Sequence, residues 1–217
     1  PHTAISHIGW AATDGPSDFE WLKKQGVEME TPMGDLGNNQ GMYFYGPDKE
    51  LVEIWTGSRN HRFEHIHMWG TDAGVTAAWF QTHLGFAARV GPKPTLKDYE
   101  NIAAIRMAFM QSDNVNVVIF ERPDFDSRWW PGGSYKKEDG PQGDFKPTKG
   151  TTIDHIAFSY RDIEPVYKRM KAAGAEIVQD IQKSEQYGHT SFFAMAPDNV
   201  LIEIVQEKPI PEGIWED

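Results

Sequence analysis

The chain has 217 residues, long enough to bury a sizeable core, and it carries 21 basic against 32 acidic residues. The net charge of −11 leaves no basic face large enough to make nucleic acid or an anionic membrane the main partner. No apolar run approaches the roughly 18 residues of a membrane span, and the absence of cysteine excludes disulfides, thiolate metal sites and cysteine nucleophiles.

The first 60 residues contain the parts of one small α+β unit. Three segments are rich in apolar and aromatic residues or alternate between apolar and polar residues, which predicts strands at 5–10, 42–45 and 51–55. Residues 17–24 predict a short helix between cap residues and a glycine. His7 lies in the first of these strands and Glu53 in the last, so both can face one side of a curved sheet.

A second unit follows with the same order of elements. Its first strand carries His65 and His67 on one face, and a helix over residues 73–84 ends at a glycine. Residues 103–109 and 116–120 are predicted strands. Residues 121–150 then show no helical or strand period, yet they contain Trp129 and Trp130, which favours an ordered excursion over the cavity or a neighbouring chain.

The third unit has the clearest helix, over residues 162–173, with apolar residues at core spacing. His155 lies on its first strand and Glu203 on its last, and strand alternation can aim both into one cavity. Tyr187 and His189 stand just before the third strand and are candidates for the cavity mouth.

Equal spacing shows that the three units are an internal repeat. Each has a histidine followed by an aspartate seven positions later, and the pairs are His7 and Asp14, His65 and Asp72, and His155 and Asp162. The interval from histidine to glutamate is 46 residues in the first unit and 48 in the third. The second unit has Val118 where the glutamate would stand.

Two imidazoles and one carboxylate on separate strands form a ligand set for a divalent ion such as iron, manganese, nickel or zinc, with positions left for substrate. We expect His65, His155 and Glu203 to be this set, and His67, Tyr187 or His189 to move a proton. The alternative is a cavity without metal, in which these groups satisfy one another by hydrogen bonds.

The repeats resemble those of the vicinal oxygen chelate superfamily, which includes glyoxalase I, bleomycin-resistance proteins, fosfomycin-resistance transferases and extradiol dioxygenases. The resemblance is carried by residues 154–158, 168–174 and 196–203, with echoes at 6–10, 45–48 and 51–53. It implies an α+β fold of three βαβββ modules, the last two paired into a half-closed mixed sheet around a metal cavity.

By this resemblance residues 61–217 hold the paired modules and the excursion at 121–150, and residues 1–60 form an unpaired module. The partner of that module would lie upstream or in a second chain, which favours a homodimer. In a dimer His7 and Glu53 would meet their symmetry mates and could form a second metal site.

The resemblance implies a metal-dependent, glyoxalase-like lyase or isomerase acting on a small substrate that chelates the metal through adjacent oxygens. An extradiol-type ring-cleaving dioxygenase is the first alternative, and a ligand-binding protein without chemistry is the second. Val118 departs from the four-ligand site of glyoxalase I, whereas Phe193 and Asn199 depart from the dioxygenase signature. The start at Pro1 suggests upstream processing, so the compartment stays open, cytoplasmic by default with export as the alternative.

Overall fold

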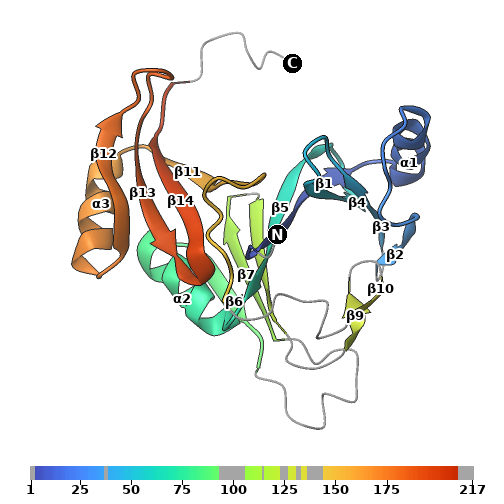
Figure 1. Cartoon of the computed structure of the whole chain (residues 1–217), viewed down its shortest axis with the longest axis horizontal. Helices are drawn as coiled ribbons and strands as arrows, with labels where there is room; N and C mark the ends of the chain where they lie inside the picture. The colour runs from blue at the N-terminus through green and yellow to red at the C-terminus, as the bar shows by residue number, and fades with distance from the viewer. Residues whose placement is uncertain are drawn as a thin grey trace.

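Three βαβββ modules follow one another along the chain in the computed structural model (Figure 1). The structure describes residues 3–36, 39–92, 106–113, 115–122, 127–130, 133–135 and 144–209. The α+β class and the three modules that the sequence predicts are confirmed. No helix within these ranges is long and apolar enough to cross a membrane.

Module one contains β1 (Ile5–Ala12), α1 (Gly15–Lys24), β2 (Gly34–Leu36), β3 (Asn39–Tyr45) and β4 (Leu51–Thr56). Module two contains β5 (Arg62–Gly70), α2 (Ala73–Leu84), β6 (Ala87–Val90), β7 (Met107–Ser112) and β8 (Val115–Glu121). Module three contains β11 (Ile156–Tyr160), α3 (Ile163–Ala172), β12 (Glu176–Lys183), β13 (Thr190–Ala196), the short 3-10 turn η2 (Pro197–Asn199) and β14 (Val200–Gln206). Between modules two and three, β9 (Ser127–Trp130) and β10 (Gly133–Tyr135) form a two-stranded sheet.

The pairing of the modules differs from the sequence prediction. Modules one and two share an eight-stranded sheet in the order β2-β3-β4-β1-β5-β8-β7-β6, and module three forms a separate four-stranded sheet in the order β11-β14-β13-β12. The expected division into an unpaired module at 1–60 and a paired unit at 61–217 is therefore wrong, because β1 and β5 pair with each other across that boundary.

The lengths of the connections explain this arrangement. Only residues 57–61 join β4 to β5, so module two must begin beside module one, where β5 lies antiparallel to β1. A much longer stretch separates β8 from β11, and it leaves module three free to form its own sheet.

The helix α2 joins the two sheets. It begins at Asp72, whose side chain accepts hydrogen bonds from the backbone N–H groups of Gly74 and Val75, and it ends at Gly85 with φ of 79°. These bounds confirm the predicted helix over residues 73–84. The helix α3 of module three lies beside α2 (Figure 1). Arg169 on α3 donates a hydrogen bond of 3.0 Å to the carbonyl of His83 on α2.

One hydrophobic core runs through α2 into module three. The ring of Phe80 on α2 lies 5.6 Å from that of Phe86 and 6.2 Å from that of Phe158 on β11, and Phe86 and Phe158 are 5.0 Å apart edge to face. The hydroxyl of Tyr160 donates to the carbonyl of Leu84 at 2.8 Å. Module three is thus packed against the α2 side of module two.

The module without a sheet partner is the third, not the first, because β11 and β14 extend no ladder to another module in the described residues. Homodimer formation stays a prediction, to be measured by sedimentation, and the sheet edge that a second chain could cover now lies in module three.

The prediction that residues 121–150 are ordered through Trp129 or Trp130 falls largely outside the described residues, which do not include these two side chains.

Phe80 provides a test of this core. Phe80→Ala should lower the free energy of unfolding by about 3–5 kcal/mol, because a fully buried ring that bridges two modules is lost. Val75→Ala on the same helix is the matched control, since Val75 is 58% exposed and its truncation should change stability by less than about 0.5 kcal/mol. Urea unfolding of both variants makes the measurement, and equal effects would contradict the packing described here.

Candidate metal centre

Sheet register brings three ligand-type side chains from two modules to one place. Gly9 on β1 pairs with Glu53 on β4 on one side and with His65 on β5 on the other. Residues directly opposite in neighbouring strands project to the same face, so Glu53 and His65 flank Gly9. His7 lies two residues before Gly9 and therefore shares that face.

The donor atoms of His7, Glu53 and His65 all lie within 4.8 Å of one another. Glu53 Oε2 is 2.9 Å from His7 Nε2 and 3.0 Å from His65 Nε2, and the two nitrogens are 3.3 Å apart. All three residues are buried, with exposed fractions of 1%, 4% and 7%. Two imidazoles and one carboxylate fit a divalent transition-metal ion.

The residue before each histidine fixes which ring nitrogen faces Glu53. Ser6 Oγ lies 3.1 Å from His7 Nδ1, and Glu64 Oε2 lies 2.5 Å from His65 Nδ1. Asn116 donates a hydrogen bond of 2.7 Å to the other oxygen of Glu64 and holds it in place. Such outer partners orient a ligand imidazole and raise its basicity, so each Nε2 is presented to the centre.

Without a metal ion, the carboxylate of Glu53 is balanced by a proton on the neighbouring imidazoles. Burial opposes protonation of His65, but the hydrogen bonds of Glu53 and Glu64 prevail and raise its pKa to about 9. Burial lowers the pKa of His7 despite its contact with Glu53. Burial also opposes ionisation of Glu53, yet the hydrogen bonds from His65 and His7 hold its pKa well below the ordinary value. The carboxylate is thus ionised, and His65 is the imidazole that holds a second proton and a positive charge.

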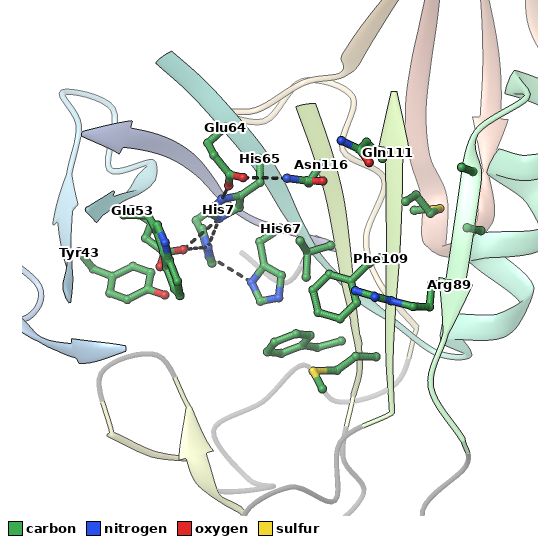
Figure 2. A pocket seen from close by; sticks show the side chains of 17 residues that line it. His7, Tyr43, Glu53, Glu64, His65, His67, Arg89, Phe109, Gln111 and Asn116 are labelled. Carbon is green, nitrogen blue, oxygen red and sulfur yellow. Dashed lines mark hydrogen bonds and ion pairs between the residues drawn. The ribbon is translucent and has the colours of Figure 1, made fainter. Parts of the chain in front are cut away.

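The centre opens into a cavity of about 850 Å³ on the inner face of the eight-stranded sheet (Figure 2). Its lining residues are His7, Tyr43, Glu53, Trp55, Glu64, His65, His67, Ala87, Ala88, Arg89, Met107, Phe109, Met110, Gln111, Asn116, Val118 and Phe120. Val118 holds in module two the place that Glu53 holds in module one: each lies opposite the residue two positions after the module's histidine. An apolar side chain there leaves the side of the centre next to β8 without a fourth ligand.

The predicted grouping of His65 with His155 and Glu203 is not what the structure shows. His155 Nε2 lies 3.2 Å from Glu203 Oε2, and His189 Nε2 lies 3.1 Å from Glu203 Oε1, but all three belong to module three, whose sheet is separate. The reason is the module pairing: β5 lies beside β1, so His65 meets His7 and Glu53 instead. In the described part of the chain, only His7, Glu53 and His65 have donor atoms close enough together for one ion.

The candidate proton carriers also separate into two places. His67 lines the cavity, with Nδ1 3.4 Å from His7 Nδ1. Tyr187 is 68% exposed and stacks on His189 at 6.0 Å, so these two lie in module three and do not line the cavity. Sequence reasoning missed Tyr43, which lies opposite Glu53 in the register of β3 and β4. Pairing the predicted strands at 42–45 and 51–55 as a hairpin, which puts Tyr43 opposite Glu53, could have found it.

Gly9 permits the close approach of His65. A Cβ atom at Gly9 would lie 2.1 Å from Cε1 of the His65 ring, and it would meet three ring atoms below 3.0 Å. Gly9→Ala should therefore displace His65 and weaken binding of Zn²⁺ or Fe²⁺ by roughly 10-fold or more, as loss of ligand orientation does, while every ligand residue is retained.

Gly34→Ala on β2 is the matched control, because nothing lies within 4 Å of a Cβ there. Isothermal titration calorimetry with each ion compares the two variants with the parent protein. Unchanged affinity in Gly9→Ala would show that His65 is not a ligand.

Comparison with solved structures supports the fold. Glyoxalase I from Zea mays aligns with a TM-score of 0.62 and 15% identity, over 94% of this chain and 68% of that one. A protein from Bacillus subtilis subsp. subtilis str. 168, provisionally assigned as a dioxygenase, aligns with a TM-score of 0.61 and 12% identity, over 95% of this chain. This chain spans 63% of the Bacillus protein.

No match was found among curated proteins. The family model described as the Glyoxalase/Bleomycin resistance protein/Dioxygenase superfamily matches residues 62–204, which are most of modules two and three. This match confirms the resemblance to the vicinal oxygen chelate superfamily, and the structural neighbours agree with it in fold. The chain belongs to the Glyoxalase/Bleomycin resistance protein/Dioxygenase superfamily.

Proposed function

We propose that the protein is a metal-dependent lyase or isomerase of glyoxalase-like type, and that its substrate is a small molecule with two adjacent oxygens. One observation carries this proposal: a buried His-Glu-His group lies at the wall of a large cavity, with an apolar side chain in the fourth ligand position. A structural metal site is usually closed by four protein ligands, whereas three ligands facing a cavity favour chemistry.

His7, Glu53 and His65 would hold the ion through two Nε2 atoms and a carboxylate oxygen. When bound, a divalent ion supplies polarisation of a substrate carbonyl and stabilisation of negative charge that develops on its oxygen. The chain contributes the remaining conditions of the site. The apolar side chains of Val118, which is partly buried, and Phe120, which is buried, limit the access of water on one side. Glu64 keeps the imidazole of His65 in a fixed orientation.

His67 is the residue in the cavity best suited to hold or move a proton. Burial lowers its pKa well below the ordinary value, so the ring is neutral. Its Nε2 is buried and makes no hydrogen bond within the described residues. A neutral imidazole carries one N–H and one free lone pair, so Nε2 can accept a proton from a substrate carbon or return one to it.

Tyr43 supports the anionic side of the centre. Burial, with the nearby charge of Glu53, raises the pKa of Tyr43 far above its usual range, so its hydroxyl keeps its proton. The Tyr43 ring also meets the His7 ring edge to face at 5.3 Å. A protonated phenol beside Glu53 can donate a hydrogen bond to the carboxylate or to a substrate oxygen.

A ring-cleaving dioxygenase is the second candidate, because two histidines and one carboxylate with open positions are also the ligand set of non-haem iron oxygenases.

Metal analysis of the purified protein is the first test. Turnover of a thiol adduct of a 2-oxoaldehyde without oxygen would support the isomerase, and turnover of a catechol that requires iron(II) and oxygen would support the dioxygenase. Metal-free protein that binds ligand without turnover would contradict both.

Two glutamates distinguish the candidate centres. Glu53→Gln should lower the affinity for the ion by roughly 100-fold, because the substitution removes the only anionic ligand of the three. Glu203→Gln is the matched variant in module three and should leave that binding step unchanged. Titration calorimetry of both variants gives the affinities and the number of ions bound. Loss of binding in Glu203→Gln alone would restore module three as the metal site.

His67 can be tested separately from the metal. His67→Phe keeps an aromatic ring in the same space but removes both nitrogens, so turnover should fall by about 100-fold or more while the metal content stays constant. Steady-state kinetics of the metal-loaded variant, together with its metal content, make the measurement. Full activity in His67→Phe would exclude this residue from proton transfer.

A further inference from the structure

A row of five side chains crosses the cavity face of the shared sheet. The register places His7 opposite His67, His67 opposite Val118, Val118 opposite Phe109, and Phe109 opposite Arg89. All five line the same cavity. The row begins at the candidate metal centre, continues through the imidazole of His67 and two apolar side chains, and ends at the guanidinium of Arg89.

The cationic end of the row is Arg89, which has no carboxylate partner among the residues that the structure describes. The Arg89 guanidinium lies over the Phe109 ring at 5.5 Å, and Figure 2 shows it directed toward His67 and the centre. Within the described residues, no carboxylate forms an ion pair with Arg89. The two glutamates that line the cavity, Glu53 and Glu64, are both engaged at the opposite end by His7, His65 and Asn116.

Phe109 makes the same end of the cavity apolar. It is 37% exposed, which is a large exposure for a phenylalanine on a sheet face, and it lies between Arg89 and Val118. The exposed ring can pack against the apolar part of a ligand. The guanidinium above it can form an ion pair with an anionic group at the end of that ligand. The net charge of −11 makes the chain as a whole unfavourable for anions. The Arg89 guanidinium is a local positive charge that can attract an anion to this end of the cavity.

We propose that the substrate is an amphiphilic carboxylate: its paired oxygens bind at the His7, Glu53 and His65 centre, its apolar body lies over Val118 and Phe109, and its carboxylate binds Arg89. The proposal rests on the proposed function for its metal-binding end only. Three strand spacings separate His7 from Phe109, about 14 Å along the sheet. Because the Arg89 side chain reaches back over Phe109, a ligand must span on the order of 10 Å between its two polar ends.

Two metal-chelating probes of equal length test this assignment. Octanohydroxamic acid and suberic acid monohydroxamate share the hydroxamate head and the number of carbons, but only the second ends in a carboxylate. Zn²⁺-loaded protein should bind the suberate probe roughly tenfold more tightly, since a charge-assisted hydrogen bond to a guanidinium is gained. The preference should decrease as salt is added, because Arg89 is exposed to solvent.

Variants of Arg89 separate the anion contact from the metal contact. Arg89→Gln should abolish the preference and leave the affinity for octanohydroxamic acid unchanged, whereas Arg89→Lys should retain part of the preference. Arg161→Gln, at an exposed position in module three, is the matched control and should behave like the parent protein. Calorimetric titration gives all of these dissociation constants.

Equal affinities for the two probes in the parent protein would overturn the assignment of Arg89, and so would a preference that survives in Arg89→Gln. Both results would leave the metal centre intact. If neither probe binds to Zn²⁺-loaded protein, or if Glu53→Gln binds both as tightly as the parent, the proposed metal centre fails and the substrate assignment fails with it.

Discussion

The pairing of β1 with β5 determines the rest of the structure. It joins two modules along their first strands and places His7 and His65 on the sheet face that lines the cavity. The pairing depends on a close fit, because the His65 ring occupies the space that any side chain at position 9 would fill. Glu53 then completes the centre from β4, which lies on the other side of β1. A single backbone ladder therefore sets both the fold of the first two modules and the composition of the centre.

Local patterns predicted the parts of the chain well. The aspartate seven residues after each histidine is the N-cap residue of each helix: Asp14, Asp72 and Asp162. The first helix was predicted over residues 17–24 and begins two residues earlier, at Gly15. The glycine after α2 ends that helix where expected. These features depend on caps and on periodicity, which are encoded within a few residues. The ligand-type positions were found in the same way, because strand alternation fixes the face on which His7, His65 and Glu53 lie.

The assembly of the parts was not predictable from the repeats. Three modules with equivalent first strands can pair in more than one way, and each pairing satisfies the same local patterns. The choice was made by the connection at residues 57–61, which is too short to allow modules one and two to separate, and by the contact of α2 with α3. Arg89 was invisible for a related reason: it belongs to the cavity only through a register that crosses five strands. Such long-range register is not written in any one segment of sequence.

The antiparallel pairing of two equivalent strands gives the cavity an approximate twofold axis, and the side chains then break that symmetry. Gly9 and His67 occupy equivalent positions, as do Glu53 and Val118. At the first pair of positions the His65 ring fills the space over Gly9 and His67 offers an imidazole, and at the second pair an acid stands opposite an apolar side chain. A flat substrate bound between them meets different chemistry on its two faces. If His67 carries a proton as proposed, that proton can reach one face only, so a reaction in this cavity that creates a new stereogenic carbon would give that carbon a single handedness.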